Sequence, residues 1–278
     1  MAISLQSKWV AWRFLPVSSV CWSVPAVIFM ALEAGPRSVS TARFRKICHH
    51  CGVDSNMTQL LPPSEQVENV SQFFQIHPEN PQARLIKQAV EIIRKGGVVI
   101  YPTDSSYAIG CQIGDKNAVE RVRRLRGLDD KHNFALICSD LSQLGLFAKI
   151  DTGLFRLLKA HLPGPYTFIL NATREVPRLL LHPKKRTIGL RVPSHPIALA
   201  LLEELGEPLM SVTLIMPGDE DPLTDPHEMR QLLEHQVDLI IDGGFGGIKA
   251  STVISLADGE PEVIRVGCGD PAPFMAEA

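Results

Sequence analysis

The chain has few cysteines, and they follow no regular spacing. Six are spread over 278 residues, at positions 21, 48, 51, 111, 138 and 268. This pattern excludes a small disulfide framework and favours buried thiols in a reducing compartment. Cys48 and Cys51 have the spacing of half a zinc site, but no second pair of ligands follows at a usual distance. We therefore expect no metal site there.

The chain also lacks an excess of charge of either sign. Its formal net charge is −2, and 45% of its residues are apolar, which is ordinary for a globular protein. The charge is unevenly distributed, because residues 71–200 contain 19 Lys and Arg against 10 Asp and Glu, whereas residues 201–278 contain 3 against 16. One interpretation is two solvated faces. The other is a cationic surface for phosphates or nucleic acid, formed by the runs 121–126 and 184–186.

Residues 1–70 differ from the rest. All three tryptophans lie there, and the run 14–34 is mostly apolar but is interrupted by Pro16 and Pro25. A signal peptide or membrane segment is one interpretation, against which stand the prolines and the lack of a good small-x-small cleavage site. We favour a poorly structured N-terminal extension, created by a start assigned upstream of Val70. We accordingly expect a cytoplasmic protein without a membrane partner.

From residue 71 onward, helical and strand patterns alternate. Apolar spacing and caps predict a helix that starts at Asn80-Pro81 and ends at Gly96, and a further helix that starts at residue 140. They also predict helices at 115–126, 151–162, 196–205 and 225–236. Strands are predicted at 97–101, 134–138, 166–170, 187–192, 209–216, 237–241, 251–256 and 263–266. The alternation predicts one α/β domain over residues 71–278, with helices on the faces of a mixed sheet. Glycine turns at 242–244 and 258–259 predict that the late strands pair antiparallel.

The segment 101–110, which reads YPTDSSYAIG, is the most informative part of the chain. It places hydroxyl groups and Asp104 where a buried strand ends, and α/β sheets bind ligands at such places. A Ser/Thr or Asx turn that only begins the next element is an equally good interpretation of these ten residues alone.

The same segment resembles the P-T-D/E-T-x-Y-G-L-G signature of the YrdC family, the threonylcarbamoyl-AMP synthases. Ser105 stands for the second Thr of that signature, and Ala108 for a Gly. Further matches follow in family order at 163–167, 187–196, 251–253 and 265–267, and the opening 71–78 is similar to the start of the YciO branch. The resemblance implies a single YrdC-like domain, with a twisted mixed parallel and antiparallel sheet and a concave cationic groove.

The resemblance also implies which residues form the site. Synthases of this family condense threonine, bicarbonate and ATP, with Mg²⁺ accompanying the nucleotide and no tightly bound cofactor. Guanidinium and hydroxyl groups suit phosphates, a carboxylate and the charge of the transition state. By match to the family motifs, the candidate catalytic residues are Arg124, Arg126 and Arg191. The candidate substrate- and nucleotide-binding residues are Thr103, Ser105, Tyr107, Thr167, Ser211, Thr213, Ser251, Thr252 and Arg265.

Two of these assignments have a structural alternative, and two motifs depart from the family. Thr167 could only end its strand, and Arg191 could be a surface arginine in a salt bridge. The family's K-x-R pair reads Arg124-Leu125-Arg126, and the loop 127–133 is about three residues longer than in the synthases. The S-x-N pair is absent, because Thr213 and Ile215, or Ser211 and Thr213, stand in its place. Arginine does not reproduce the geometry of lysine, and an isoleucine supplies no amide hydrogen bonds.

Three functional hypotheses follow. The first is a protein that binds ATP or AMP and acts in threonylcarbamoyl-AMP chemistry related to tRNA threonylcarbamoyladenosine modification, as a weak synthase or as an enzyme that consumes the adenylate. The second is a protein that binds double-stranded RNA, tRNA or ribosomal RNA without synthase activity, based on the basic runs and the missing S-x-N pair. The third is a nucleotide-binding fold with another small substrate.

Overall fold

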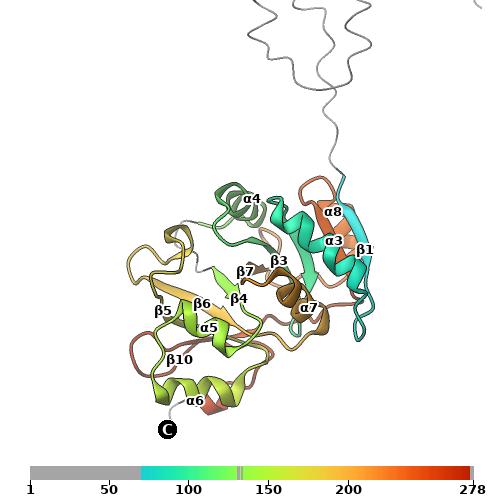
Figure 1. The fold of residues 1–278 in the computed structure, drawn as a ribbon. Coiled ribbons are helices and arrows are strands. Elements are labelled where there is room, and N and C mark those ends of the chain that lie inside the picture. Colours follow the sequence, from blue (N-terminus) through green and yellow to red (C-terminus); the bar gives the residue numbers. More distant parts are fainter. Residues whose placement is uncertain (1–69, 130–131, 133, 276–278) are drawn as a thin grey trace, which may run out of the picture. The chain divides into compact units, whose positions relative to one another are not determined.

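A computed structural model of the chain describes residues 70–129, 132 and 134–275 (Figure 1). The predicted N-terminal extension lies outside the described residues, apart from Val70, and so do the cysteines at 21, 48 and 51. Among the residues that are described, no helix has the length and apolar character needed to cross a membrane.

Within the described residues, ten strands form one sheet. Their order across it is β1-β8-β2-β3-β7-β4-β6-β5-β9-β10. The pairs β1–β8, β2–β8, β4–β6 and β5–β9 are parallel and the other pairs are antiparallel, so the predicted mixed sheet is confirmed. The strands are β1 (Gln72–Gln75), β2 (Val99–Pro102), β3 (Tyr107–Gln112), β4 (Ala135–Ile137), β5 (Tyr166–Asn171), β6 (Thr187–Arg191), β7 (Leu209–Thr213), β8 (Leu239–Asp242), β9 (Thr252–Ser255) and β10 (Glu262–Arg265).

Helices pack on both faces of this sheet. They are α3 (Ala83–Arg94), α4 (Lys116–Arg126), α5 (Leu141–Phe147), α6 (Thr152–His161), α7 (Pro196–Leu205) and α8 (Pro226–Leu233), with short 3-10 turns η2 (Arg178–Leu180) and η3 (Ala272–Phe274). On one face, α3 and α7 pack against Val99, Tyr101 and Ala108. On the other, α4, α5, α6 and α8 share a core with Ile100 and Ile109. Neighbouring strand residues thus enter different cores, as the pleat of a β-strand requires.

The ends of several helices follow local sequence signals. Asp115 begins α4, because its carboxylate accepts hydrogen bonds from the backbone amides of Asn117 and Ala118 at 2.9 and 3.0 Å. Gly127 ends the same helix with a φ of +61°, a left-handed conformation that favours glycine. The predicted start at Asn80-Pro81 is wrong, because α3 begins at Ala83 with Gln82 as its N-cap.

Three features of the sheet differ from the prediction. Strands β1 and β3 had no predicted counterpart, and β3 contains the second half of the segment 101–110. The turn at 258–259 does join the antiparallel pair β9 and β10, as expected. The turn at 242–244 does not form a hairpin, because β8 pairs in parallel with β1 and β2 while β9 pairs in parallel with β5.

The described cysteines only partly match the predicted buried thiols. Cys111 and Cys138 are buried, and burial raises the pKa of each thiol to about 12. Cys268 is exposed, contrary to the expectation. Since a thiol with a raised pKa stays protonated and unreactive at neutral pH, the two buried cysteines act as small apolar side chains.

Candidate functional site

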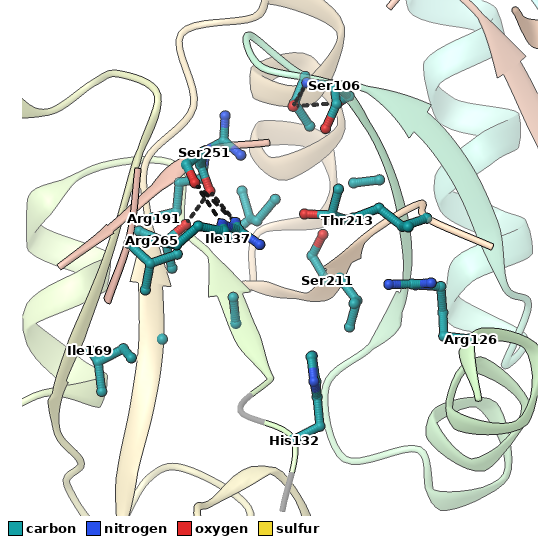
Figure 2. Close-up of a pocket in the computed structure, with 18 of the residues that line it drawn as sticks. Ser106, Arg126, His132, Ile137, Ile169, Arg191, Ser211, Thr213, Ser251 and Arg265 are labelled. Atoms are coloured by element: carbon teal, nitrogen blue, oxygen red, sulfur yellow. Dashed lines mark hydrogen bonds between the residues drawn. The ribbon is translucent and has the colours of Figure 1, made fainter. Parts of the chain in front are cut away.

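A cavity of about 580 Å³ lies on the same sheet face as α3 and α7. Figure 2 shows the residues that line it. Ala108 and Ile137 border both the cavity and the core beneath the two helices. The floor comes from alternate residues of successive strands. It consists of Ala108, Ala135, Ile137, Ile169, Gly189 and Val253. The cavity therefore has an apolar floor made by the sheet.

Most of the predicted site residues line this cavity. They are Thr103, Arg126, Thr167, Arg191, Ser211, Thr213, Ser251 and Arg265. The concave cationic groove that the family resemblance implies thus has a counterpart here, formed by three arginines and several hydroxyl groups. Ser105, Tyr107, Arg124 and Thr252 do not line it.

Tyr107 and Thr252 lie outside the cavity because of strand alternation. Tyr107 precedes Ala108 on β3, and Thr252 stands between Ser251 and Val253, so each points to the opposite side of the sheet from its cavity-lining neighbours. The Tyr107 hydroxyl donates to the carbonyl of Gly244 at 2.7 Å. The Thr252 hydroxyl donates to the carbonyl of Gly269 at 2.6 Å. Both side chains therefore hold loops in place, and the prediction that they face the ligand cavity is wrong.

Arg124 is also placed away from the cavity. It is exposed on α4, and its Nε lies 3.5 Å from the carbonyl oxygen of Glu120. Arg126 is two residues later and lines the cavity. Since residues two apart in a helix do not share a face, only one of the two arginines can point inward. The prediction that both face the cavity is thus wrong for Arg124.

The turn 103–106 joins β2 to β3 and uses its own hydroxyl groups. Thr103 Oγ1 accepts hydrogen bonds from the amides of Ser105 and Ser106 at 3.3 and 3.4 Å and donates to the carbonyl of Ser106 at 2.6 Å. Ser105 is buried and does not line the cavity, and its Oγ lies 3.2 Å from Thr103 Oγ1. The Ser/Thr turn predicted as an alternative is therefore present, and Thr103 lines the cavity as well.

Arg191, at the end of β6, is deeply buried. Only 7% of its side chain is exposed, so it is not a surface arginine. Its Nη2 forms an ion pair with Asp104 Oδ1 and donates to Ser105 Oγ at 2.9 Å. Its Nε is buried and has no hydrogen-bond partner among the described residues. A buried donor without a partner is unusual in a folded protein, and here it belongs to a residue that lines a cavity.

Arg265 lies at the same end of the cavity (Figure 2). Its Nε and Nη2 donate to the carbonyl oxygen of Ser251 at 3.2 and 2.9 Å, and the Ser251 and Thr167 hydroxyls are 2.8 Å apart. Burial, and then the positive charge of Arg191, lower the pKa of Arg265. Two guanidinium groups thus repel each other here, and an anion between them would be stabilised by both.

Arg126 and His132 lie away from this pair (Figure 2). Burial lowers the pKa of Arg126, whose Nε has no partner within the part of the chain that is described. His132 was not predicted. Burial and the charge of Arg126 lower its pKa, which favours a neutral imidazole. The only signal in the sequence was its place in the loop 127–133, which is longer than in the synthases.

Ile215 and Ile264 also line the cavity. Ile215 stands where one alignment places the asparagine of the family's S-x-N pair, so an apolar side chain occupies a position at which the synthases have an amide. Ser211 and Thr213, the hydroxyl groups of that region, line the cavity from β7.

Several of the basic residues form contacts within the protein. Arg121 forms an ion pair with Asp238 at 2.8 Å, and the guanidinium of Arg123 lies 5.2 Å from the centre of the Phe134 ring. Lys185 pairs with Asp258 at 3.5 Å on the surface. Part of the positive charge of the basic runs is therefore neutralised within the protein and is not available to a ligand.

We expect the stability of the folded protein to depend on pH through His195, which lies next to this site. Its Nδ1 accepts a hydrogen bond from the amide of Ile197 at 3.2 Å and thereby caps α7. Burial lowers the pKa of His195, and the nearby Asp104 only partly opposes this. The unfolded chain, with a pKa near 6.5, then binds more protons than the folded chain, so stability is lost as the pH falls below about 6.5. His132, with its lowered pKa, contributes in the same direction.

We expect His195→Asn to reduce this dependence, because asparagine caps a helix without titrating. A cap contributes about 1 kcal/mol, so between pH 7.5 and 5.5 the melting temperature of the variant should fall by about 2–4 °C less than that of the wild type. Thermal unfolding followed by circular dichroism measures the difference. His235→Asn, at an exposed position, is the control. Identical pH profiles for all three proteins would contradict the assignment to His195.

Comparison with known proteins gives consistent matches. The family model described as "Telomere recombination" (Sua5/YciO/YrdC) matches residues 91–267. The chain is 60% identical to the protein YciO of Escherichia coli K12 over 206 residues, which cover 74% of this chain and 100% of YciO. The crystal structure of E. coli YciO superposes with a TM-score of 0.72 over the same shares of the two chains.

The threonylcarbamoyl-AMP synthases are less similar in sequence to this chain than YciO is. A threonylcarbamoyl-AMP synthase of Halorhodospira halophila is 31% identical over 170 residues, covering 61% of this chain and 88% of the synthase. The crystal structure of Pyrococcus abyssi Sua5 complexed with L-threonine is 30% identical, with a TM-score of 0.66 over 71% of this chain and 58% of Sua5. On the length of the matched region and the identity to full-length relatives, the chain belongs to the Sua5/YciO/YrdC family.

Proposed function

We propose that the protein binds ATP or AMP in the cavity and acts in threonylcarbamoyl-AMP chemistry linked to tRNA modification. One observation carries the proposal: three arginines line a single cavity, and two of them have a buried Nε without a partner among the described residues. Guanidinium groups in this arrangement suit phosphate oxygens. Membership of a family that contains threonylcarbamoyl-AMP synthases supports the choice of reaction.

The size and lining of the cavity suit a nucleotide. Its volume of about 580 Å³ falls within the usual range for small-molecule sites. The apolar floor would contact the base and the ribose, and the arginines and hydroxyl groups would contact the phosphates. Mg²⁺ would enter with ATP as part of the substrate. Threonine and bicarbonate are the other substrates in this proposal, and the Sua5 structure complexed with L-threonine supports threonine as a small-molecule partner.

We propose further that synthase activity is weak and that consumption of the adenylate is the better activity. Ile215 offers no hydrogen bond in the cavity, and Arg124 is exposed on α4. Hydrolysis of a supplied adenylate needs fewer simultaneous contacts than the condensation of three substrates. Binding of double-stranded RNA, tRNA or ribosomal RNA remains a prediction from the basic runs, in which Arg121 and Lys185 already have acidic partners.

The test has two parts. Calorimetry with AMP and with Mg²⁺-ATP measures binding directly, and we expect both to bind to the purified protein. A pyrophosphate-release assay then compares ATP alone with ATP plus threonine and bicarbonate. Pyrophosphate that forms only with all three substrates would support the synthase reaction, and loss of a supplied threonylcarbamoyl-AMP faster than in buffer would support its consumption. If neither AMP nor Mg²⁺-ATP binds, the proposal is ruled out.

A further inference from the structure

We propose that Asp104 is a positioning residue, which holds the guanidinium of the cavity-lining Arg191 in place for an anionic ligand. The inference rests on the proposed function only in that the ligand is an anion. Asp104 lies in the turn between β2 and β3, and Arg191 lies at the end of β6. These segments are far apart in the sequence, and the ion pair between them joins the turn to the far wall of the site.

Both carboxylate oxygens of Asp104 are engaged. Oδ1 forms the ion pair with Arg191 Nη2. Oδ2 accepts hydrogen bonds from the backbone amide and the hydroxyl of Ser194, at 3.3 and 3.0 Å. Only 11% of the Asp104 side chain is exposed. The carboxylate is thus fixed by a backbone group three residues beyond Arg191, and it cannot turn away from the guanidinium without losing these bonds.

One nitrogen of the Arg191 guanidinium is held by the protein, and another on the same edge of the group is buried without a partner in the described part of the chain. Nη2 is bound by Asp104 and by Ser105 Oγ at 2.9 Å, whereas the buried Nε has no partner among the described residues. Because the group is planar, contacts at one nitrogen set the direction of the other donors. A long side chain held in this way loses little further conformational entropy when a ligand binds.

Charge alone would give Asp104 the opposite role. A carboxylate beside Arg191 lowers the positive potential that an anion meets, so it could compete with the ligand rather than assist it. The neighbouring Arg265 also lines this end of the cavity, so two guanidinium groups face one carboxylate there. The two roles predict opposite effects when the charge of Asp104 is removed.

The experiment is a double-mutant cycle on binding. We expect Asp104→Asn to weaken AMP binding by about tenfold, because the loss of a charge-assisted hydrogen bond is of this size. In the Arg191→Ala background, the same substitution should not weaken AMP binding, because no guanidinium remains to be positioned, and loss of the unpaired carboxylate should leave binding equal or tighter. Adenosine, which has no phosphate, should bind the wild type and Asp104→Asn alike. A merely structural defect would weaken both ligands and would persist in the Arg191→Ala background.

Two further variants keep the test decisive. Asp258→Asn breaks an exposed ion pair with Lys185 outside the cavity and should bind AMP as the wild type does. Ser194→Ala removes one bond that holds Asp104 while keeping its charge, and it should weaken AMP binding by about 2- to 10-fold. This variant also serves if Asp104→Asn does not fold, because Ser194 is exposed and tolerates truncation more readily.

The outcomes separate this inference from the proposed function when the cycle is repeated with pyrophosphate. Equal or tighter AMP binding by Asp104→Asn, or an equal loss in the Arg191→Ala background, would overturn the positioning role while leaving nucleotide binding intact. Coupling with pyrophosphate but no AMP binding to the wild type would support the role of Asp104 and reject the nucleotide. Absence of binding of both anions would overturn both proposals.

Discussion

Replacing Arg191 with alanine should weaken AMP binding by about 10- to 150-fold. The estimate corresponds to the loss of one charge-assisted contact, roughly 1.5–3 kcal/mol. Arg191 lines the cavity, is nearly fully buried and has an unpartnered Nε among the described residues. A contact made there is shielded from water, so salt screens it less than a contact on the surface. The effect should therefore persist at moderate ionic strength.

Calorimetry at two salt concentrations checks this expectation. Arg156→Ala is a suitable control, because Arg156 is exposed on α6 and does not line the cavity. Arg191→Ala leaves the carboxylate of Asp104 without its cation, so the melting temperature has to be measured for each variant. The double variant with Asp104→Asn relieves this unpaired charge. Equal affinities of the folded variant and the wild type would rule Arg191 out as an anchor.

Threonylcarbamoyl-AMP formation by the wild type should be slow compared with that of a synthase that has the S-x-N pair. Ile215 lines the cavity and provides neither a donor nor an acceptor. Contacts that form only in the transition state affect the catalytic rate constant directly, so their loss lowers the rate even at saturating substrate.

Ile215→Asn should restore part of the rate, by about 2- to 10-fold, because one hydrogen bond contributes roughly 0.5–1.5 kcal/mol. The family has a lysine at the position of Arg124, so Arg124→Lys is the matching second change. Since Arg124 is exposed and outside the cavity, this change should add little to the rate. Ile248→Asn, at an exposed position outside the cavity, controls for the chemical change itself.

The same pyrophosphate assay, run side by side with an S-x-N synthase, measures these rates. A wild-type rate comparable to that of the reference enzyme would show that the asparagine is dispensable in this branch. A gain with Ile248→Asn as large as with Ile215→Asn would show that the effect does not arise in the cavity.

Much of the site could be predicted from the sequence because its residues lie in short, recognisable segments. The caps of α4, Asp115 and Gly127, follow local rules that hold in any fold. Arg191, Ser251 and Arg265 were identified by motif, and their strands bring them to one end of the cavity. Such predictions succeed where a residue's role depends on its immediate neighbours in the chain.

The wrong predictions depend on geometry that local patterns do not contain. Because the strand β3 was missed, the side of the sheet to which Tyr107 points could not be assigned, and a shift of one residue reverses it. For the same reason, the side of the sheet to which Thr252 points could not be assigned, although both of its neighbours line the cavity. The ion pair of Asp104 with Arg191 depends on two strands that meet only after the sheet has formed, so no spacing in the sequence could indicate it.

The strand order also has a consequence for the route by which the chain folds. The first strand, β1, has β8 as its neighbour, and the paired residues Gln75 and Asp242 are 167 positions apart. The strand β2 lies next to β8 as well, so the amino-terminal part of the sheet stays incomplete until β8 is available. At usual rates of synthesis this wait is on the order of 10–30 s, and folds dominated by such distant pairings form slowly. During that time, the unpaired backbone groups of β1 and β2 are exposed to other chains, and protection by a chaperone would matter most then.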